Sequence, residues 1–197
     1  MERNFIDGYT EWQSNPEIVG VNKIPAHATL MPYENFDEAK QAERYKSSRC
    51  KLLNGKWKFK LYKNYAYRPS DFAQPHYDSH NWDTINVPGS WQMQGYDQSQ
   101  YCNVRYPWEG SEDICPPNAP TKHNPVGCYI KKIHINKSLL DKRVVLCFEG
   151  VESAFYLYVN GERVGYSEST FHRSEFDISK HIKEGSNVIG VEVYRWC

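Results

Sequence analysis

Paired carboxylates are the first groups in this sequence that could carry out chemistry. Glycoside hydrolysis commonly uses two carboxyl groups, about 5 to 5.5 Å apart for retention of configuration and roughly 6.5 to 9.5 Å apart for inversion. The candidates that lie close in sequence are Glu109 with Glu112 and Asp113, Glu149 with Glu152, and Glu168 with Glu175. Each also has a simpler interpretation, as a solvated loop charge or as a residue beside a strand turn. The sequence therefore indicates no catalytic pair.

The candidate metal ligands and nucleophiles in the sequence are not supported by their spacing either. His76 and His80 are four residues apart, but Pro75 makes a helix there doubtful, so the spacing loses its geometric meaning. Ser167 and Ser169 lie outside any G-x-S-x-G turn, and the sequence has no glycine-rich phosphate loop. We predict neither a metal site nor a catalytic residue in this chain.

The six cysteines show no C-x-x-C spacing and belong to a chain too large to need disulfides for stability. We expect reduced and mostly buried thiols, with Cys197 exposed at the end of the chain. They stand at positions 50, 102, 115, 128, 147 and 197.

Charge and hydropathy exclude several classes of partner. The 197 residues include 24 Lys plus Arg and 24 Asp plus Glu, so a net charge of zero gives no attraction to nucleic acid. No run approaches the roughly 18 to 20 apolar residues of a membrane span, and residues 1–4 offer no apolar export segment. The sequence predicts a cytoplasmic protein with no nucleic-acid or membrane partner. Its 15 Tyr and 6 Trp against 8 Phe suit β-sheets and carbohydrate faces.

The elements that must position any site are strands. Trp57, Phe59 and Leu61 alternate with lysines, which is typical of a half-buried strand, and Asn160-Gly161 between two apolar runs indicates a tight hairpin. A polar crossover is expected over 174–182, and Val144 to Phe148 is interpreted as a buried apolar run. The fold class predicted is an all-β jelly-roll β-sandwich. Its expected strands cover 56–61, 84–87, 129–135, 144–148, 154–159, 162–166 and 188–194.

Two segments depart from the strand pattern. Residues 1–47 are expected to form an irregular N-terminal arm, in which Asn35 and Glu38 could cap a short helix, and residues 48–197 the jelly-roll domain. Residues 88–125 hold six of the eleven prolines together with many aromatic residues. A loop this long is usually functional or disordered, and its aromatics argue against disorder. We interpret it as an ordered loop that presents side chains to something outside the sheets.

Several segments resemble the amino-terminal domain of family 2 glycoside hydrolases of the β-galactosidase type. The most specific are VPGSWQMQGYD at 87–97, YCNVRYP at 101–107 and NPVGCY at 124–129. The resemblance continues through FEGVESAF at 148–155, VNG at 159–161, VGY at 164–166 and SEFD at 174–177, and toward the start through LNGKW at 53–57. It covers nearly the whole chain.

The resemblance implies a sugar-binding jelly roll followed, in the family, by immunoglobulin-like domains and a TIM barrel. The catalytic glutamates and the Mg and Na sites of such an enzyme lie in the later part, so we expect this chain to be truncated before those domains and inactive alone. The implied partners are a β-galactoside substrate, bound together with the rest of the enzyme, and further copies in a homo-oligomer. No cofactor is expected in this segment, and no metal site is assigned to Glu11 and Asn15, whose spacing differs from that of relatives with a structural magnesium.

One site position follows from the resemblance. Asn103 matches the asparagine that the family's loop extends into the active site, and Val104 beside it is expected to touch the substrate. The interpretation without the family is a loop asparagine that caps a turn.

Two alternatives remain open at this point. One is an independent carbohydrate-binding module with aromatic stacking platforms, formed by Trp91, Tyr96, Tyr101, Tyr106 and Trp108. The other is the first domain of a β-glucuronidase or β-mannosidase relative, which the segment at 91–97 disfavours.

Overall fold

The computed structural model describes residues 11–101 and 103–197, and strands supply most of its regular structure. The strands are Gly20–Val21 (β1), Gly55–Tyr62 (β2), Asp83–Val87 (β3), Val126–Ile135 (β4), Val145–Phe148 (β5), Ala154–Val159 (β6), Glu162–Ser167 (β7), Ser174–Asp177 (β8) and Gly185–Tyr194 (β9). The helices are Glu11–Ser14 (α1) and Phe36–Gln41 (α2), with single 3-10 turns at Arg44–Lys46, Tyr65–Tyr67, Gln92–Gln94 and Lys137–Leu139.

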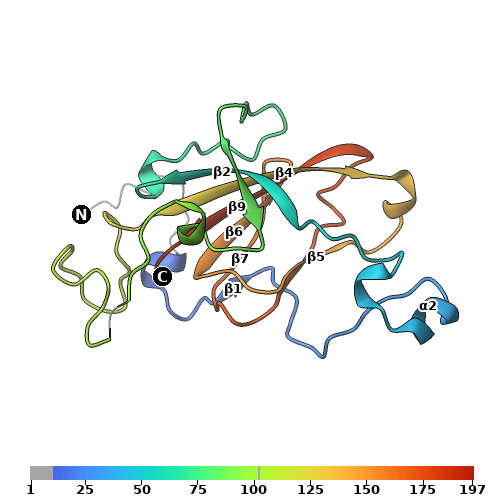
Figure 1. Cartoon of the computed structure of the whole chain (residues 1–197), viewed down its shortest axis with the longest axis horizontal. Coiled ribbons are helices and arrows are strands. Elements are labelled where there is room, and N and C mark those ends of the chain that lie inside the picture. The colour runs from blue at the N-terminus through green and yellow to red at the C-terminus, as the bar shows by residue number, and fades with distance from the viewer. Residues whose placement is uncertain (1–10, 102) are drawn as a thin grey trace.

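The strands form two antiparallel sheets (Figure 1). Seven strands lie in the order β1-β7-β6-β9-β4-β2-β3, and β5 pairs with β8 in a second sheet. β9 lies between β6 and β4, so strands distant in sequence are neighbours, as in jelly rolls. Leu146 of β5 and Phe176 of β8 pack into one apolar cluster with residues of the larger sheet. The predicted all-β sandwich is confirmed.

Both faces of the larger sheet are covered, which explains why β6 is buried along its whole length. Phe155, Leu157 and Val159 point into the cluster shared with β5 and β8. Tyr156 and Tyr158 point into a second cluster on the opposite face, which includes Phe72, Trp82 and Trp12. Because successive strand residues face opposite sides, a strand buried on both faces reads as a continuous apolar run.

The Asn160-Gly161 hairpin between β6 and β7 is confirmed. Both residues have positive φ, 52° and 86°, which a type I′ turn requires. A Cβ on Gly161 would also lie 2.3 Å from the end of the Gln74 side chain, which would have to move, but the positive φ is what calls for glycine here. Asn160 accepts a hydrogen bond from the Val188 N–H at 2.9 Å and thereby ties the turn to β9.

The N-terminal arm is irregular but anchored, and its first ten residues lie outside the described part of the chain. Trp12 of α1 is buried and stacks on Tyr194 with ring centroids 4.5 Å apart. β1 pairs with β7, so part of the arm joins the sheet edge. The predicted cap is present: the Asn35 side chain accepts from the Glu38 N–H at 2.9 Å, and the helix ends at Gln41.

Two expectations about strands were wrong. Residues 174–177 form strand β8 rather than a polar crossover, because their backbone pairs with β5. β5 is not fully buried: Leu146 and Phe148 pack inward, whereas Val145 and Cys147 face solvent. The two-stranded sheet covers the larger sheet with one face only, so an alternating burial pattern results.

The cysteines differ from expectation in burial. Those described are free thiols, and Cys197 is exposed as expected, but Cys115 and Cys147 are exposed too and only Cys128 among them is fully buried. Cys102 lies outside the described residues. In the part of the chain that the structure describes, no helix has the length and apolarity needed to span a membrane.

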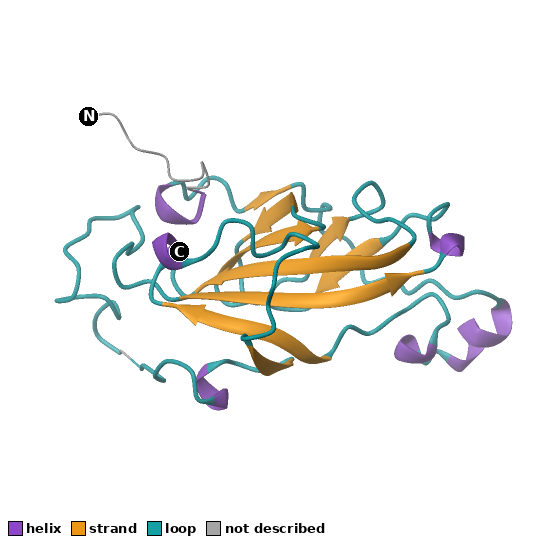
Figure 2. Ribbon diagram, turned by 90° about the horizontal axis from the view of Figure 1, so that it is seen from above, coloured by secondary structure: helices purple, strands orange, loops and turns teal. Residues whose placement is uncertain are grey.

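Figure 2 shows how the elements are distributed along the long axis of the molecule. The loop at 88–125 and the end of the chain extend from one end of the sandwich, whereas α2 lies at the opposite end. The long loop and the end of β9 thus lie at the same end of the sandwich, and the candidate site is formed there.

Candidate functional site

The loop at 88–125 begins against the sheet. The Trp91 side chain is 5% exposed and packs beside Phe59 of β2, with ring centroids 6.1 Å apart. The Gln94 side chain donates to the Asn86 carbonyl at 3.0 Å and accepts from the Asn86 N–H at 2.8 Å. Its amide thus satisfies backbone groups that edge strand β3 would otherwise expose. The first part of the loop is thereby fixed to the sheet.

Arg195, directly after β9, binds the next part of the loop. Its guanidinium forms an ion pair with the Asp97 carboxylate and donates to the Gln98 carbonyl at 3.0 Å. Both charged side chains are largely shielded, at 11% and 17% exposure. The guanidinium carbon also lies 4.7 Å from the ring centroid of Trp196. One arginine therefore connects the end of the sheet to the loop.

The tip of the loop, residues 101–106, projects away from the sandwich. Gln100 donates to the Pro107 carbonyl at 2.9 Å and closes the base of the tip. Tyr101 and Val104 are 88% and 91% exposed, and Asn103 is exposed as well. The Tyr101 hydroxyl lies 3.4 Å from the Asn103 Oδ1, a long contact that leaves the amide nitrogen available at the surface. Asn103 and Val104 thus lie next to each other in the exposed tip of the loop.

Glu112 holds the returning part of the loop. Its carboxylate accepts hydrogen bonds from the Thr121 N–H and hydroxyl and from the N–H groups of Lys122 and His123, over 2.9 to 3.3 Å. Partial burial raises the pKa of Glu112, but these hydrogen bonds outweigh burial and hold the pKa below its usual value. Glu112 is a structural anchor and carries its charge at neutral pH.

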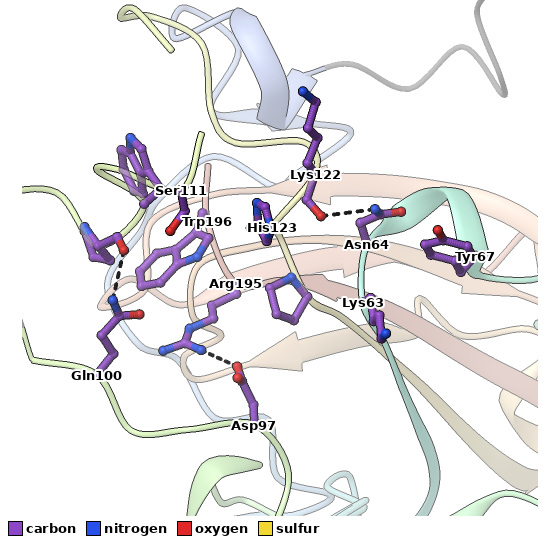
Figure 3. Close-up of a pocket in the computed structure, with 13 residues that line it drawn as sticks. Lys63, Asn64, Tyr67, Asp97, Gln100, Ser111, Lys122, His123, Arg195 and Trp196 are labelled. Carbon is purple, nitrogen blue, oxygen red and sulfur yellow. Dashed lines mark hydrogen bonds and ion pairs between the residues drawn. The ribbon is translucent and has the colours of Figure 1, made fainter. Parts of the chain in front are cut away.

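A hollow of about 440 Å³ opens between the two sides of the loop and the end of β9 (Figure 3). Arg195, Asp97, Gln100 and Trp196 line one part of it, and His123, Lys122 and Asn64 line another. Within the second part, the Asn64 side chain donates to the Lys122 carbonyl at 3.2 Å and connects the segment after β2 to the returning side of the loop. The hollow is open to solvent and is lined by both aromatic and polar side chains. Asp97 is the one carboxylate among the described residues that line it, and it is engaged by Arg195.

Residues 50–197 match the family model described as glycosyl hydrolases family 2, sugar binding domain. The chain belongs to this family. The sugar-binding domain is 48% identical over 190 residues to the β-galactosidase of Priestia megaterium, covering 96% of this chain and 18% of that protein. It is 44% identical over 185 residues to the β-galactosidase of Clostridium acetobutylicum, covering 94% and 20%.

A third relative, the β-galactosidase large subunit of Leuconostoc lactis, is 38% identical over 197 residues, covering 94% of this chain and 31% of the relative. The chain therefore spans less than a third of the length of these relatives. Among solved structures, the β-glucuronidase of Bifidobacterium dentium complexed with coumarin-3-O-glucuronide aligns with a TM-score of 0.52 at 21% identity, covering 72% of this chain and 19% of that one. At this identity the likeness concerns the fold.

The structure assigns other roles to most carboxylates that the sequence singled out. Glu149 forms ion pairs with Arg44 and Arg173, at 3.1 and 2.7 Å. Glu175 pairs with His27 and Arg173. Carboxylates already bound by arginine or histidine stabilise the sugar-binding domain and are poor acids or nucleophiles.

Glu168 differs from these carboxylates because burial raises its pKa, against the lowering effects of the Tyr166 hydroxyl and Lys23. Its described partners are Tyr166 and Lys23, not a second carboxylate. A perturbed acid without such a partner does not meet the requirement of glycoside hydrolysis for two.

The aromatic residues proposed as stacking platforms are mostly engaged within the domain, which is a correction to the module hypothesis. Trp91 is buried, and Tyr96 contacts Phe59 edge-on at 4.8 Å. Trp108 stacks on Tyr106 at 5.1 Å and meets Trp196 edge-on at 5.7 Å. The stacked pair covers one face of Trp108 and one of Tyr106, whereas Tyr101 remains 88% exposed.

Glu11 and Asn15 do not fit a cation site. Glu11 forms an ion pair with Arg163 and accepts from the Tyr156 hydroxyl at 2.7 Å. Burial raises the pKa of Glu11, and the bonds from Tyr156 and Arg163 reverse that effect and lower it. Asn15 instead accepts from the Glu17 N–H at 3.2 Å. An arginine already supplies the positive charge at this carboxylate, and the described residues contain no cluster of three or more His, Cys, Asp or Glu side chains suited to a metal.

The residues that build the site but escaped sequence reasoning are Asp97, Arg195 and Glu112 in its anchoring role. Arg195 lies 98 positions from Asp97 in sequence, and no local spacing connects them. His76 and His80 lie in irregular chain, and His80 bonds to Asp78 at 2.8 Å.

Proposed function

We propose that this chain is the amino-terminal domain of a β-galactosidase that hydrolyses terminal β-D-galactosides with retention of configuration. The observation that carries the proposal is the 48% identity to the Priestia megaterium β-galactosidase over 96% of this chain. The remainder of such an enzyme would supply the catalytic carboxylates and the Mg and Na sites, and would assemble as a homo-oligomer.

Within that enzyme the tip at 101–106 contributes Asn103 to the substrate site. An amide can donate to and accept from sugar hydroxyls without adding a charge that would perturb neighbouring glutamates. The exposure of Asn103 and Val104 supports this role, because a loop that completes a site on another domain must present side chains with few partners of their own. Val104 contributes an apolar contact to the same substrate.

A domain exchange tests the proposal. This chain replaces the matching first segment of the Priestia megaterium β-galactosidase, and turnover is measured with chromogenic galactoside and glucuronide. We expect hydrolysis of the galactoside. Asn103→Ala in the chimera should lower kcat/KM by on the order of tenfold or more, since an unpaired polar group in a closed site costs roughly 1 to 3 kcal/mol.

Asn118→Ala is the matched control, because Asn118 is another loop amide and bonds locally to the Cys115 carbonyl at 3.0 Å. It should leave the kinetics unchanged. Wild-type kinetics in a folded Asn103→Ala chimera would remove Asn103 from the site, and a folded chimera that hydrolyses no galactoside would overturn the β-galactosidase proposal.

A further inference from the structure

We propose that Arg195 is a positioning residue that holds the loop so that Asn103 reaches the substrate. The proposal rests on the proposed function, since it gives Arg195 an effect that acts through Asn103. Arg195 lies outside the tip. Its described contacts lie at the base of the loop.

The first line of evidence is the connection from Arg195 to the outgoing side of the loop. Its guanidinium binds the Asp97 carboxylate and the Gln98 carbonyl together on this side. Its backbone N–H donates to the Pro125 carbonyl at 3.1 Å, at the end of the returning side. Asp97 has a φ of 59°, in the left-handed region, where a non-glycine residue requires local support. The fork of an arginine can serve a carboxylate and a carbonyl at once, whereas the ammonium of lysine is a single point charge.

The second line of evidence is the connection from the neighbouring residue to the returning side. Trp196 meets Trp108 edge-on at 5.7 Å, and its backbone is fixed by the buried Asn124 side chain, which accepts from the Trp196 N–H at 3.0 Å and donates to its carbonyl at 2.8 Å. Figure 3 shows Arg195 and Trp196 side by side between the two sides of the loop. Arg195 and Trp196, directly after β9, therefore hold both sides of the loop.

The third line of evidence is how local the contacts of the tip are. Among the described residues, Tyr101 contacts Asn103, Tyr106 contacts Trp108, and the base is closed by Gln100 and Pro107. Contacts of this kind shape the tip but do not orient it relative to the sandwich. Orientation relative to the sandwich comes from the two residues after β9. Trp196 contacts Trp108, on which Tyr106 stacks, and Arg195 binds Asp97 and Gln98 below the base.

Amide hydrogen exchange in the 197-residue chain tests the holding role directly. The amides to follow are those of Glu109 and Ser111, which donate to the Tyr106 and Trp108 carbonyls at 3.1 and 2.9 Å next to the tip. Arg195→Gln should raise their exchange by on the order of tenfold while β4 and β9 retain wild-type protection, because loops open independently of the sheet. Arg195→Lys should give rates between those of the wild type and Arg195→Gln. Arg143→Gln is the control, since it breaks the Arg143–Asp177 ion pair, 2.9 Å in length, beside the second sheet. Unchanged exchange of these two amides in Arg195→Gln would overturn the proposal.

A double-mutant cycle in the chimera described above tests whether Arg195 acts through Asn103. Arg195→Gln should lower kcat/KM by on the order of tenfold when Asn103 is present and by less than about twofold when Asn103 is alanine. If Arg195→Gln instead caused a general loss of structure, it would lower kcat/KM by the same factor with Asn103 and with alanine at that position. That result would overturn the positioning role. If Asn103→Ala alone is without effect, the site assignment under the proposed function fails, whereas the exchange experiment still decides whether Arg195 holds the loop.

Discussion

Gly127 of β4 lies so close to Trp91 that no side chain fits between them. A Cβ on Gly127 would stand 2.4 Å from the Cζ3 atom of Trp91 and 2.9 Å from Cε2 of Phe59. Because Gly127 has no side chain, the Trp91 indole packs directly against the backbone of β4. The start of the long loop therefore depends on glycine at this position.

Gly127→Ala should destabilise the fold by about 1 to 3 kcal/mol, because the added methyl group forces two rings apart in a packed cluster. The measurement is the midpoint of urea unfolding. Gly20→Ala is the control, since its Cβ would meet mainly the flexible Lys23 side chain, at 3.2 Å or more. Equal midpoints for the two variants would show that Trp91 can move aside without cost.

Arg68→Ala should cost about 3 to 5 kcal/mol of unfolding free energy, because it leaves the Glu192 carboxylate buried without its cation. The two side chains are 7% and 1% exposed, with Nε and Oε1 2.7 Å apart. The same unfolding assay with Arg44→Ala, which breaks an exposed pair with Glu149, should lose at most about 1 kcal/mol. Similar losses in both variants would contradict a special role for the buried pair.

The chain by itself should not hydrolyse a chromogenic galactoside. Retaining hydrolysis requires a positioned acid and a nucleophile, and Glu112, Glu149 and Glu168 are instead bound to backbone amides, an arginine and a hydroxyl. Turnover that persists through purification and disappears in Glu112→Gln or Glu109→Gln would overturn this expectation.

Calorimetric titration of the chain with lactose should show weak or undetectable binding. Asn103 offers one or two hydrogen bonds of about 0.5 to 1.5 kcal/mol each, less than the free energy lost on association. Tyr101 and Tyr106 remain exposed, at 88% and 62%, so Tyr101→Ala and Tyr106→Ala are the variants to compare. Micromolar affinity that either substitution abolishes would favour the carbohydrate-binding module.

His27 should make stability depend on pH. Its Nδ1 faces the Ala28 carbonyl at 2.7 Å and its Nε2 faces Glu175 at 2.6 Å, so both ring nitrogens donate only in the imidazolium form. The backbone contact and then Glu175 raise the pKa of His27 above 6.5.

Because the pKa of His27 is raised in the folded state, its contribution is full below about pH 6.5 and is lost as the pH rises through the folded-state value. An NMR titration of the imidazole should give a pKa above 6.5 in the wild type and a lower one in Glu175→Gln. An identical His27 pKa in both proteins would show that Glu175 does not stabilise the imidazolium.

Sequence patterns predicted the sheet because strand signals are local. The alternation from Trp57 to Leu61 appears as β2, and the Asn160-Gly161 pair appears as the turn between β6 and β7. The short strand β8 escaped, because Ser174 and Glu175 are polar in sequence and became strand residues only by pairing with Phe148 and Cys147. Its existence depends on a partner about 27 residues away, which no local pattern encodes.

For the site, the sequence by itself determined the family, through the segments at 87–97, 101–107 and 124–129, and so singled out Asn103. Only the tertiary structure decided that Trp91 is a core residue, that Glu112 anchors a loop and that Arg195 binds Asp97. Backbone propensities act over a few residues, whereas burial and ion pairing depend on which distant segments the completed sheet brings together. Arg195 reaches Asp97 because β9, in the middle of the larger sheet, ends beside the start of the loop.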